Sequence, residues 1–182
     1  MIESLQEIFS MVCAQNSAHT WAPGGELLPL CQRCTGFYTG AALALALLLV
    51  FRPKPDGRFR RLHLALVLAM TPFGFHLVPQ EELLRTVSGY WFGFGVVGLL
   101  WLLPARRFFP RLKTSGVLLP LCWGAPGLVL LPVMASRGGH AAALLLSWLA
   151  AAGWLGLAGL VLANTAVACS WCLRAPRLAR EG

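Results

Sequence analysis

The chain has 182 residues, of which 57% are hydrophobic and only 12% are charged, and its mean hydropathy is +0.67. A soluble domain of this length needs more polar groups to cover its surface, so the composition excludes a soluble globular protein and indicates an integral membrane protein in contact with the lipid bilayer. The net charge is +8, but the basic residues lie in short clusters between apolar runs rather than on a polar domain, which argues against nucleic acid as a partner.

The first residues predict a short amphipathic helix. Ile2, Leu5, Ile8, Phe9 and Val12 recur at helical spacing. We expect this helix to lie on the outer membrane surface and to bring the following cysteine to the membrane boundary. It belongs to a predicted extracytoplasmic segment, residues 1–34.

Five apolar runs are long enough to cross about 30 Å of hydrocarbon at about 1.5 Å per residue. They cover residues 35–51, 62–78, 86–104, 115–135 and 141–168. We therefore predict an all-α integral membrane protein, with a bundle of about five transmembrane helices over residues 35–172. The fourth run contains Pro120, Pro126 and Pro132, so we expect it to bend or to re-enter the membrane.

The basic residues predict the orientation of the bundle. The first loop, the third loop and the tail hold twelve of the fifteen lysines and arginines, while Arg33, Arg85 and Arg137 fall on the opposite side. Since basic segments favour the cytoplasm, the N-terminus is expected outside and the tail, residues 173–182, in the cytoplasm. The predicted location is the cell inner or plasma membrane, with multiple passes.

Glycines occur where helices could approach closely. Gly36 and Gly40 form a G-x-x-x-G pattern, and Gly89, Gly93 and Gly95 lie in the third run. Small residues at this spacing favour helix packing over a substrate site.

Two C-x-x-C pairs occur among six cysteines, Cys31 with Cys34 and Cys169 with Cys172. With five spans these pairs are a bilayer apart, so a shared four-thiolate site is not expected. Cys13 precedes the same span as the first pair. We expect Cys169, Cys172 and Cys122 to be packing residues or reduced thiols.

The outer cysteines have four interpretations, the simplest being free thiols without a specific role. Cys13, Cys31 and Cys34 with His19 form a recognised tetrahedral zinc set, and a turn over Pro23–Gly25 allows the loop to fold back on itself. A closed four-ligand site of this kind is structural, so catalysis is not expected. Alternatively, Cys13 forms a stabilising disulfide with one of the other two cysteines, or the pair acts in a membrane thiol-disulfide oxidoreductase with Cys13 as the resolving thiol.

The remaining polar residues near the outer ends of the spans are Arg33, Tyr38, His76, Arg85 and His140. With them the outer side has a wider range of titratable side chains than the inner side, where the charged groups are nearly all basic. If the protein has a functional pocket, we expect it on the outer side. A third possible function, beside the metal-binding protein and the oxidoreductase, is that of an accessory subunit. Seven tryptophans and few polar groups fit a chain packed against other membrane subunits.

The N-terminal half resembles a known family. Its pattern, L-P-x-C-x-R-C-T-G-x-Y-x-G preceded by a Cys-His-Gln, is that of predicted membrane proteins of bacteria and archaea grouped as domain of unknown function 2085. The spacing between Cys13 and Cys31 is that of the family, and "LLRTVSGYWFGFG" is similar to a later family segment. The matching residues of the first segment are Cys13, Gln15, Gly25, Leu28, Pro29, Cys31, Arg33, Cys34, Thr35, Gly36, Tyr38 and Gly40.

The resemblance covers roughly Cys13 to Gly95 and implies that the three outer thiols act as one unit. Three positions depart from the family pattern: Ala14 replaces a histidine, His19 an arginine, and Phe73 the aspartate of an Asp-Gly pair. Chemistry that depends on those polar groups would be lost here, whereas the scaffold and the thiols are retained.

Overall fold

The computed structural model describes residues 2–108 and 119–178. Its helices are α1 (Ile2–Phe9), α2 (Gln32–Phe51), α3 (Gly57–Leu68), α4 (Thr71–Gly74), α5 (Glu82–Phe108), α6 (Leu119–Gly124), α7 (Gly127–Arg137) and α8 (His140–Leu178), with short 3-10 turns η1 (Ser17–His19) and η2 (Pro23–Gly25). The described part is all-α and has no strand beyond one isolated bridge. The predicted N-terminal helix is present, although it ends at Phe9.

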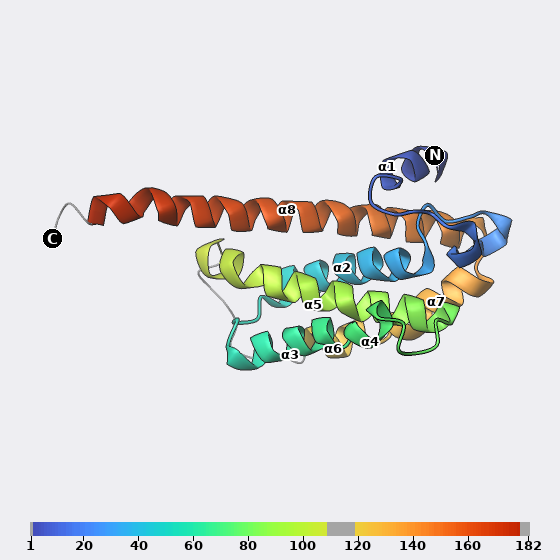
Figure 1. Cartoon of the computed structure of the whole chain (residues 1–182), viewed down its shortest axis with the longest axis horizontal. Helices are drawn as coiled ribbons and strands as arrows, with labels where there is room; N and C mark the ends of the chain where they lie inside the picture. Colours follow the sequence, from blue (N-terminus) through green and yellow to red (C-terminus); the bar gives the residue numbers. More distant parts are fainter. Residues whose placement is uncertain (1, 109–118, 179–182) are drawn as a thin grey trace.

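Three helices are long and apolar enough to cross a membrane. They are α2, α5 and the stretch His140–Trp171 of α8. Helix α2 contacts both of the others, and the shorter helices pack mainly against α5, α2 and α8 (Figure 1). The N-terminal segment and the start of α2 lie at one end of this bundle, and the start of α3 and the end of α5 lie at the other (Figure 1).

The α2–α5 interface is a direct backbone contact that glycines make possible. A Cβ atom on Gly36 would collide with the carbonyl oxygen of Thr86, and one on Gly89 would collide with that of Arg33. Gly40 and Gly93 show the same relation one turn further along. The expectation of close helix packing at these glycines is therefore confirmed, and it fixes the start of α2 against the start of α5.

Two of the expected spans are interrupted helices. The run over residues 62–78 forms α3, which starts earlier than expected, and the single turn α4, with a break before Pro72. The proline-rich fourth run forms α6 and α7, with a break at Ala125 and Pro126, as the bend expected there requires. Its first residues, 115–118, lie outside the described residues.

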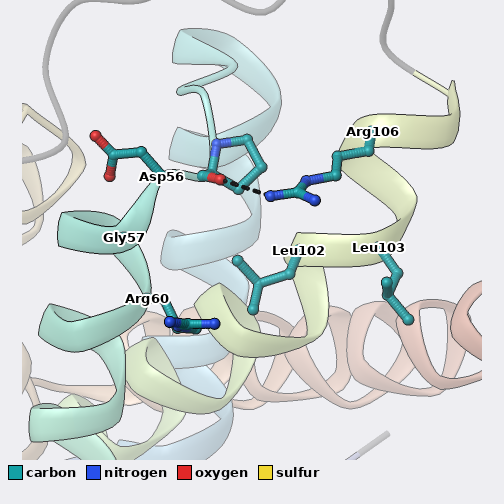
Figure 2. Close-up of a pocket in the computed structure, with 7 residues that line it drawn as sticks. Asp56, Gly57, Arg60, Leu102, Leu103 and Arg106 are labelled. Atoms are coloured by element: carbon teal, nitrogen blue, oxygen red, sulfur yellow. Dashed lines mark hydrogen bonds between the residues drawn. The ribbon is translucent and has the colours of Figure 1, made fainter.

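Side chains anchor the end of the bundle that carries the basic residues. Asp56 caps α3 by accepting a hydrogen bond from the Phe59 backbone N–H at 2.7 Å. The Arg106 guanidinium donates to the Pro55 carbonyl oxygen at 3.3 Å, across a cavity of about 270 Å³ that Arg60 and Leu102 also line (Figure 2). These contacts hold the loop between α2 and α3 against the end of α5.

Candidate metal centre

The three outer cysteines come together through the segment between α1 and α2. Cys13 follows α1, Cys31 is the residue that precedes α2, and Cys34 lies in the first turn of α2. The chain reverses at η2, where Gly24 and Gly25 have φ angles of 65° and 84°, a left-handed conformation that glycine adopts without strain. The turn expected over Pro23–Gly25 is thus confirmed.

Gln15 holds the two halves of this segment together. Its side-chain amide donates to the carbonyl oxygens of Gln6 at 2.6 Å and Pro29 at 2.9 Å. An isolated antiparallel bridge between Thr20 and Cys31 adds a second link. Because Gln15 is two residues after Cys13 and Pro29 two before Cys31, these bonds bring the two cysteines side by side.

The sulfur atoms of Cys13, Cys31 and Cys34 all lie within 4.8 Å of one another. All three are free thiols in this structure, with Cys13 buried and the other two half-buried. Tetrahedral zinc with Zn–S bonds of about 2.3 Å separates its sulfurs by about 3.8 Å. Small side-chain adjustments would therefore bring these three sulfurs onto one ion.

Hydrogen bonds to sulfur favour the thiolate form at Cys13. The thiol groups of Cys31 and, to a lesser extent, Cys34 lower the pKa of Cys13 well below its usual range. The backbone N–H groups of Cys31 and Gln15 also donate to the Cys13 sulfur, at 3.4 Å and 3.5 Å. Because the thiolate is the metal ligand and also the nucleophile, this environment suits both interpretations of the cluster.

A cavity of about 340 Å³ lies beside the cluster and gathers most of the polar residues predicted for the outer side. Cys31 and Cys34 form part of its wall, whereas His19 lies on the wall and outside the group of three sulfurs. The other predicted residues on the wall are Arg33, His76 and Arg85. A cavity thus lies on the side where one was expected, although the cavity beside Arg60 and Arg106 shows that cavities are not confined to this side.

Tyr38 is placed differently. It is buried in a small cluster with Phe9, Cys13 and Leu30, and its ring centroid lies 5.9 Å from that of Phe9. The ring of Trp154 on α8 contacts Phe9 from another side, at 6.5 Å. Tyr38 therefore packs against the buried side of the sulfur cluster, next to Cys13, and does not line the cavity.

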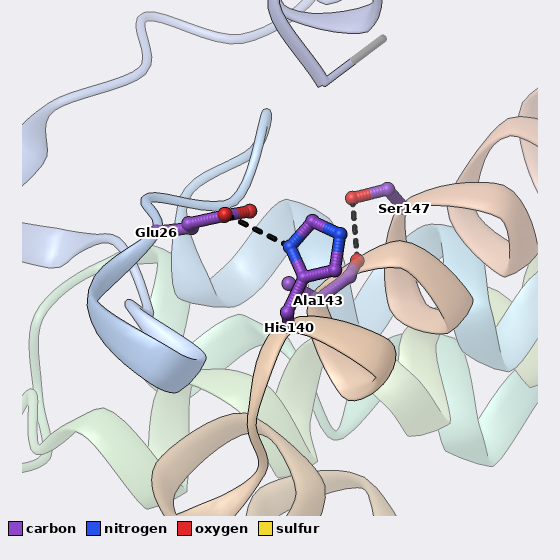
Figure 3. Close-up of polar contacts among 4 residues, drawn as sticks. All are labelled: Glu26, His140, Ala143 and Ser147. Carbon is purple, nitrogen blue, oxygen red and sulfur yellow. Dashed lines mark hydrogen bonds and ion pairs between the residues drawn. The ribbon is translucent and has the colours of Figure 1, made fainter.

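His140 is also placed away from the cavity wall. Its Nδ1 atom lies 2.8 Å from a carboxylate oxygen of Glu26, next to η2, while Ser147 one turn beyond Ala143 bonds within α8 (Figure 3). Both partners of the His140–Glu26 pair are exposed, so the pair contributes roughly 0–1 kcal/mol when the imidazole is charged. It links the start of α8 to the loop that carries the cysteines.

Sequence reasoning missed Gln80. Its side-chain oxygen accepts a hydrogen bond from the Arg33 guanidinium at 2.6 Å, and the Phe73 carbonyl oxygen accepts a longer one at 3.4 Å. Nothing in the pattern of the sequence marks Gln80, because it lies in the segment between α4 and α5 and meets Arg33 only once that segment has folded. Ala14, where the family pattern has a histidine, also lies on the cavity wall.

The other cysteines lie elsewhere. Cys122 on α6 and Cys169 on α8 are exposed free thiols. The part of α8 that contains Cys169 extends away from the start of α2, toward the opposite end of the bundle (Figure 1). The sequence-based separation of the two C-x-x-C pairs agrees with this arrangement.

Three candidate membrane-spanning helices with a three-thiol cluster at the start of the first define a polytopic membrane protein with a group that could hold a metal ion. The family model of DUF2085, described as a predicted membrane protein, matches residues 13–99. That range starts at the first cysteine of the cluster and ends within α5, so the resemblance in the N-terminal half is confirmed. The comparisons with curated proteins and with solved structures found no match.

Proposed function

We propose that this membrane protein binds one structural or ligand-binding zinc ion through Cys13, Cys31 and Cys34 at the outer face of the bilayer. The observation that carries the proposal is the mutual approach of the three sulfurs to within 4.8 Å. Three thiolates with one further ligand form a common zinc set. His19, on the wall of the adjacent cavity, is the protein residue proposed for the fourth position in a zinc site whose four ligands all come from the protein.

The surroundings of the sulfurs support a metal more than an isolated redox pair. All three sulfurs lie within 4.8 Å of one another, as a three-thiolate metal set requires. Backbone N–H donors to the Cys13 sulfur match the outer hydrogen bonds that orient metal ligands. The thiol-disulfide oxidoreductase remains the second candidate, and the lowered pKa of Cys13 is the observation that favours it.

We further propose five membrane crossings, with α3–α4 and α6–α7 as the two interrupted ones. The extracytoplasmic segment would be residues 1–34, the bundle residues 35–172 and the cytoplasmic tail residues 173–182, in the inner or plasma membrane. The position of Arg52, Arg60 and Arg106 at the end of the bundle opposite the cysteines supports this orientation. Alkaline phosphatase fused to the C-terminus should be inactive; an active fusion contradicts the orientation.

Elemental analysis of the purified protein tests the zinc proposal. We expect about one zinc per chain in the wild type and a loss of most of it in Cys31→Ser, because a hydroxyl replaces a thiolate ligand. Cys169→Ser is the matched control, since Cys169 is an exposed thiol outside the cluster, and it should keep its zinc.

The same purified proteins distinguish the zinc site from the thiol-disulfide oxidoreductase. A metal-free, folded wild-type protein whose outer thiols form one reversible disulfide, counted by alkylation with and without reductant, would replace the zinc proposal with the oxidoreductase. Zinc at full occupancy with three protected thiols supports the metal site.

A further inference from the structure

The cavity beside the three cysteines has the size and the opening of a ligand site. Its volume is about 340 Å³, near the lower end of the range for small-molecule sites, so it suits a small ligand. Cys31 and Cys34 lie on its wall, whereas Cys13 is buried behind them. An ion held by the three sulfurs would therefore have its fourth position next to this cavity.

The charges on the wall are cationic. Arg33 and Arg85 line the cavity together with His19 and His76, and none of the described residues on its wall carries a carboxylate. Glu81 and Glu82 are close to Arg85 in sequence but are exposed and do not belong to the wall. The wall is thus complementary to a negative charge.

Interactions within the chain leave these guanidinium groups incompletely satisfied. Within residues 2–108 and 119–178, no hydrogen bond or ion pair holds the guanidinium of Arg85. Arg33 donates from Nη2 to Gln80, but its Nε atom is buried without a partner among the described residues. Buried donors are normally paired, so the Arg33 Nε has unused capacity for a ligand, and the half-buried Arg85 guanidinium on the same wall adds a second donor group.

The charge balance of the metal-loaded centre also favours a negatively charged ligand. One divalent ion with three thiolates carries one net negative charge, and the two guanidinium groups carry two positive charges. The centre would keep one positive charge in excess. A bound monoanion would neutralise it.

We propose that the cavity binds a small oxyanion, a carboxylate or a phosphate group, which takes the fourth position on the metal ion and is held by Arg33 and Arg85. This inference rests on the metal site proposed above. Guanidinium groups suit the ligand because their planar donors match the two oxygens of a carboxylate or phosphate. The site is then an open three-thiolate centre, in contrast to the closed four-ligand set expected from the sequence.

Cobalt-loaded protein provides the test, because Co²⁺ in the zinc site reports its own ligands in the visible spectrum. The protein in neutral detergent is loaded with Co²⁺ and titrated with sodium acetate or sodium phosphate. We expect a saturable change in the d–d bands while the thiolate-to-cobalt charge-transfer band persists. Arg85→Gln should weaken this response at least tenfold with cobalt still bound.

Arg137→Gln is the matched control, since Arg137 is an exposed arginine at the end of α7 and outside the cavity wall. It should titrate like the wild type. To identify the source of the anion, the cobalt protein is also placed in phosphatidylcholine vesicles with and without phosphatidylglycerol. A response to free acetate or phosphate assigns a soluble anion, and a response only to phosphatidylglycerol assigns a lipid headgroup; both support the oxyanion.

Two results overturn the inference, and they are distinguishable. Cobalt bound through thiolates with a spectrum that no oxyanion alters contradicts the cavity proposal and leaves the metal site intact. The absence of any thiolate-to-cobalt band contradicts the metal site itself, and the oxyanion proposal fails with it. An equal loss of response in Arg85→Gln and Arg137→Gln would show a general charge effect and also contradict the proposed binding mode.

Discussion

At the residue scale, the sulfur cluster depends on side chains that are not ligands. Gln15 has a φ of 50° and ties the segment after α1 to the segment before α2 through two carbonyl oxygens. The sequence could predict the grouping of Cys13 with Cys31 and Cys34, because all three precede one apolar run. It could not predict the role of Gln15, since the two bonds exist only once the loop has folded.

Gln15→Ala should weaken zinc binding about 10–100-fold, because the amide that holds Cys13 beside Cys31 is lost while all three thiols remain. Competition with a chromophoric chelator measures the change. Gln6→Ala is the control: it keeps the backbone carbonyl oxygen that accepts the Gln15 bond and loses only a long side-chain bond to the Leu27 carbonyl oxygen, at 3.5 Å, so it should retain affinity. Unchanged affinity in Gln15→Ala would show that the cluster is ordered without this link.

At the level of the helices, the contact between the starts of α2 and α5 holds the residues of the sulfur cluster and the cavity in place. Their backbones touch through Gly36 and Gly89, and Trp21 donates to the Thr86 hydroxyl at 2.9 Å, so the loop is anchored on α5 as well. The glycine spacing predicted this packing. The ends of the interrupted helices were less predictable, because a proline indicates a break without fixing which residues leave the helix.

Gly36→Leu should lower the stability of the fold by about 1–3 kcal/mol or more, since the side chain would have to separate α2 from α5. Thermal unfolding in detergent should show a lower midpoint. Gly159→Leu is the matched control: Gly159 is an exposed glycine of α8 where an added Cβ meets no atom within 4 Å. Equal midpoints for the two variants would contradict the close contact.

At the scale of the whole molecule, one end of the bundle is basic and the other carries the cysteines and the cavity. Composition and the distribution of arginines were sufficient to predict the all-α membrane class and this asymmetry. The convergence of Arg33, His76 and Arg85 on one cavity could be anticipated only as a shared side, because their contacts depend on how α4 and α5 meet α2. The role as an accessory subunit remains a prediction that no contact among the described residues tests.

In the proposed centre, the three outer thiolates hold one zinc ion with one position open to the cavity. X-ray absorption at the zinc edge of the purified, zinc-loaded protein tests it most directly. We expect three sulfur neighbours at about 2.3 Å and one oxygen or nitrogen neighbour at about 2.0 Å. Four sulfur neighbours, or a zinc bound without sulfur, would contradict a centre built from Cys13, Cys31 and Cys34.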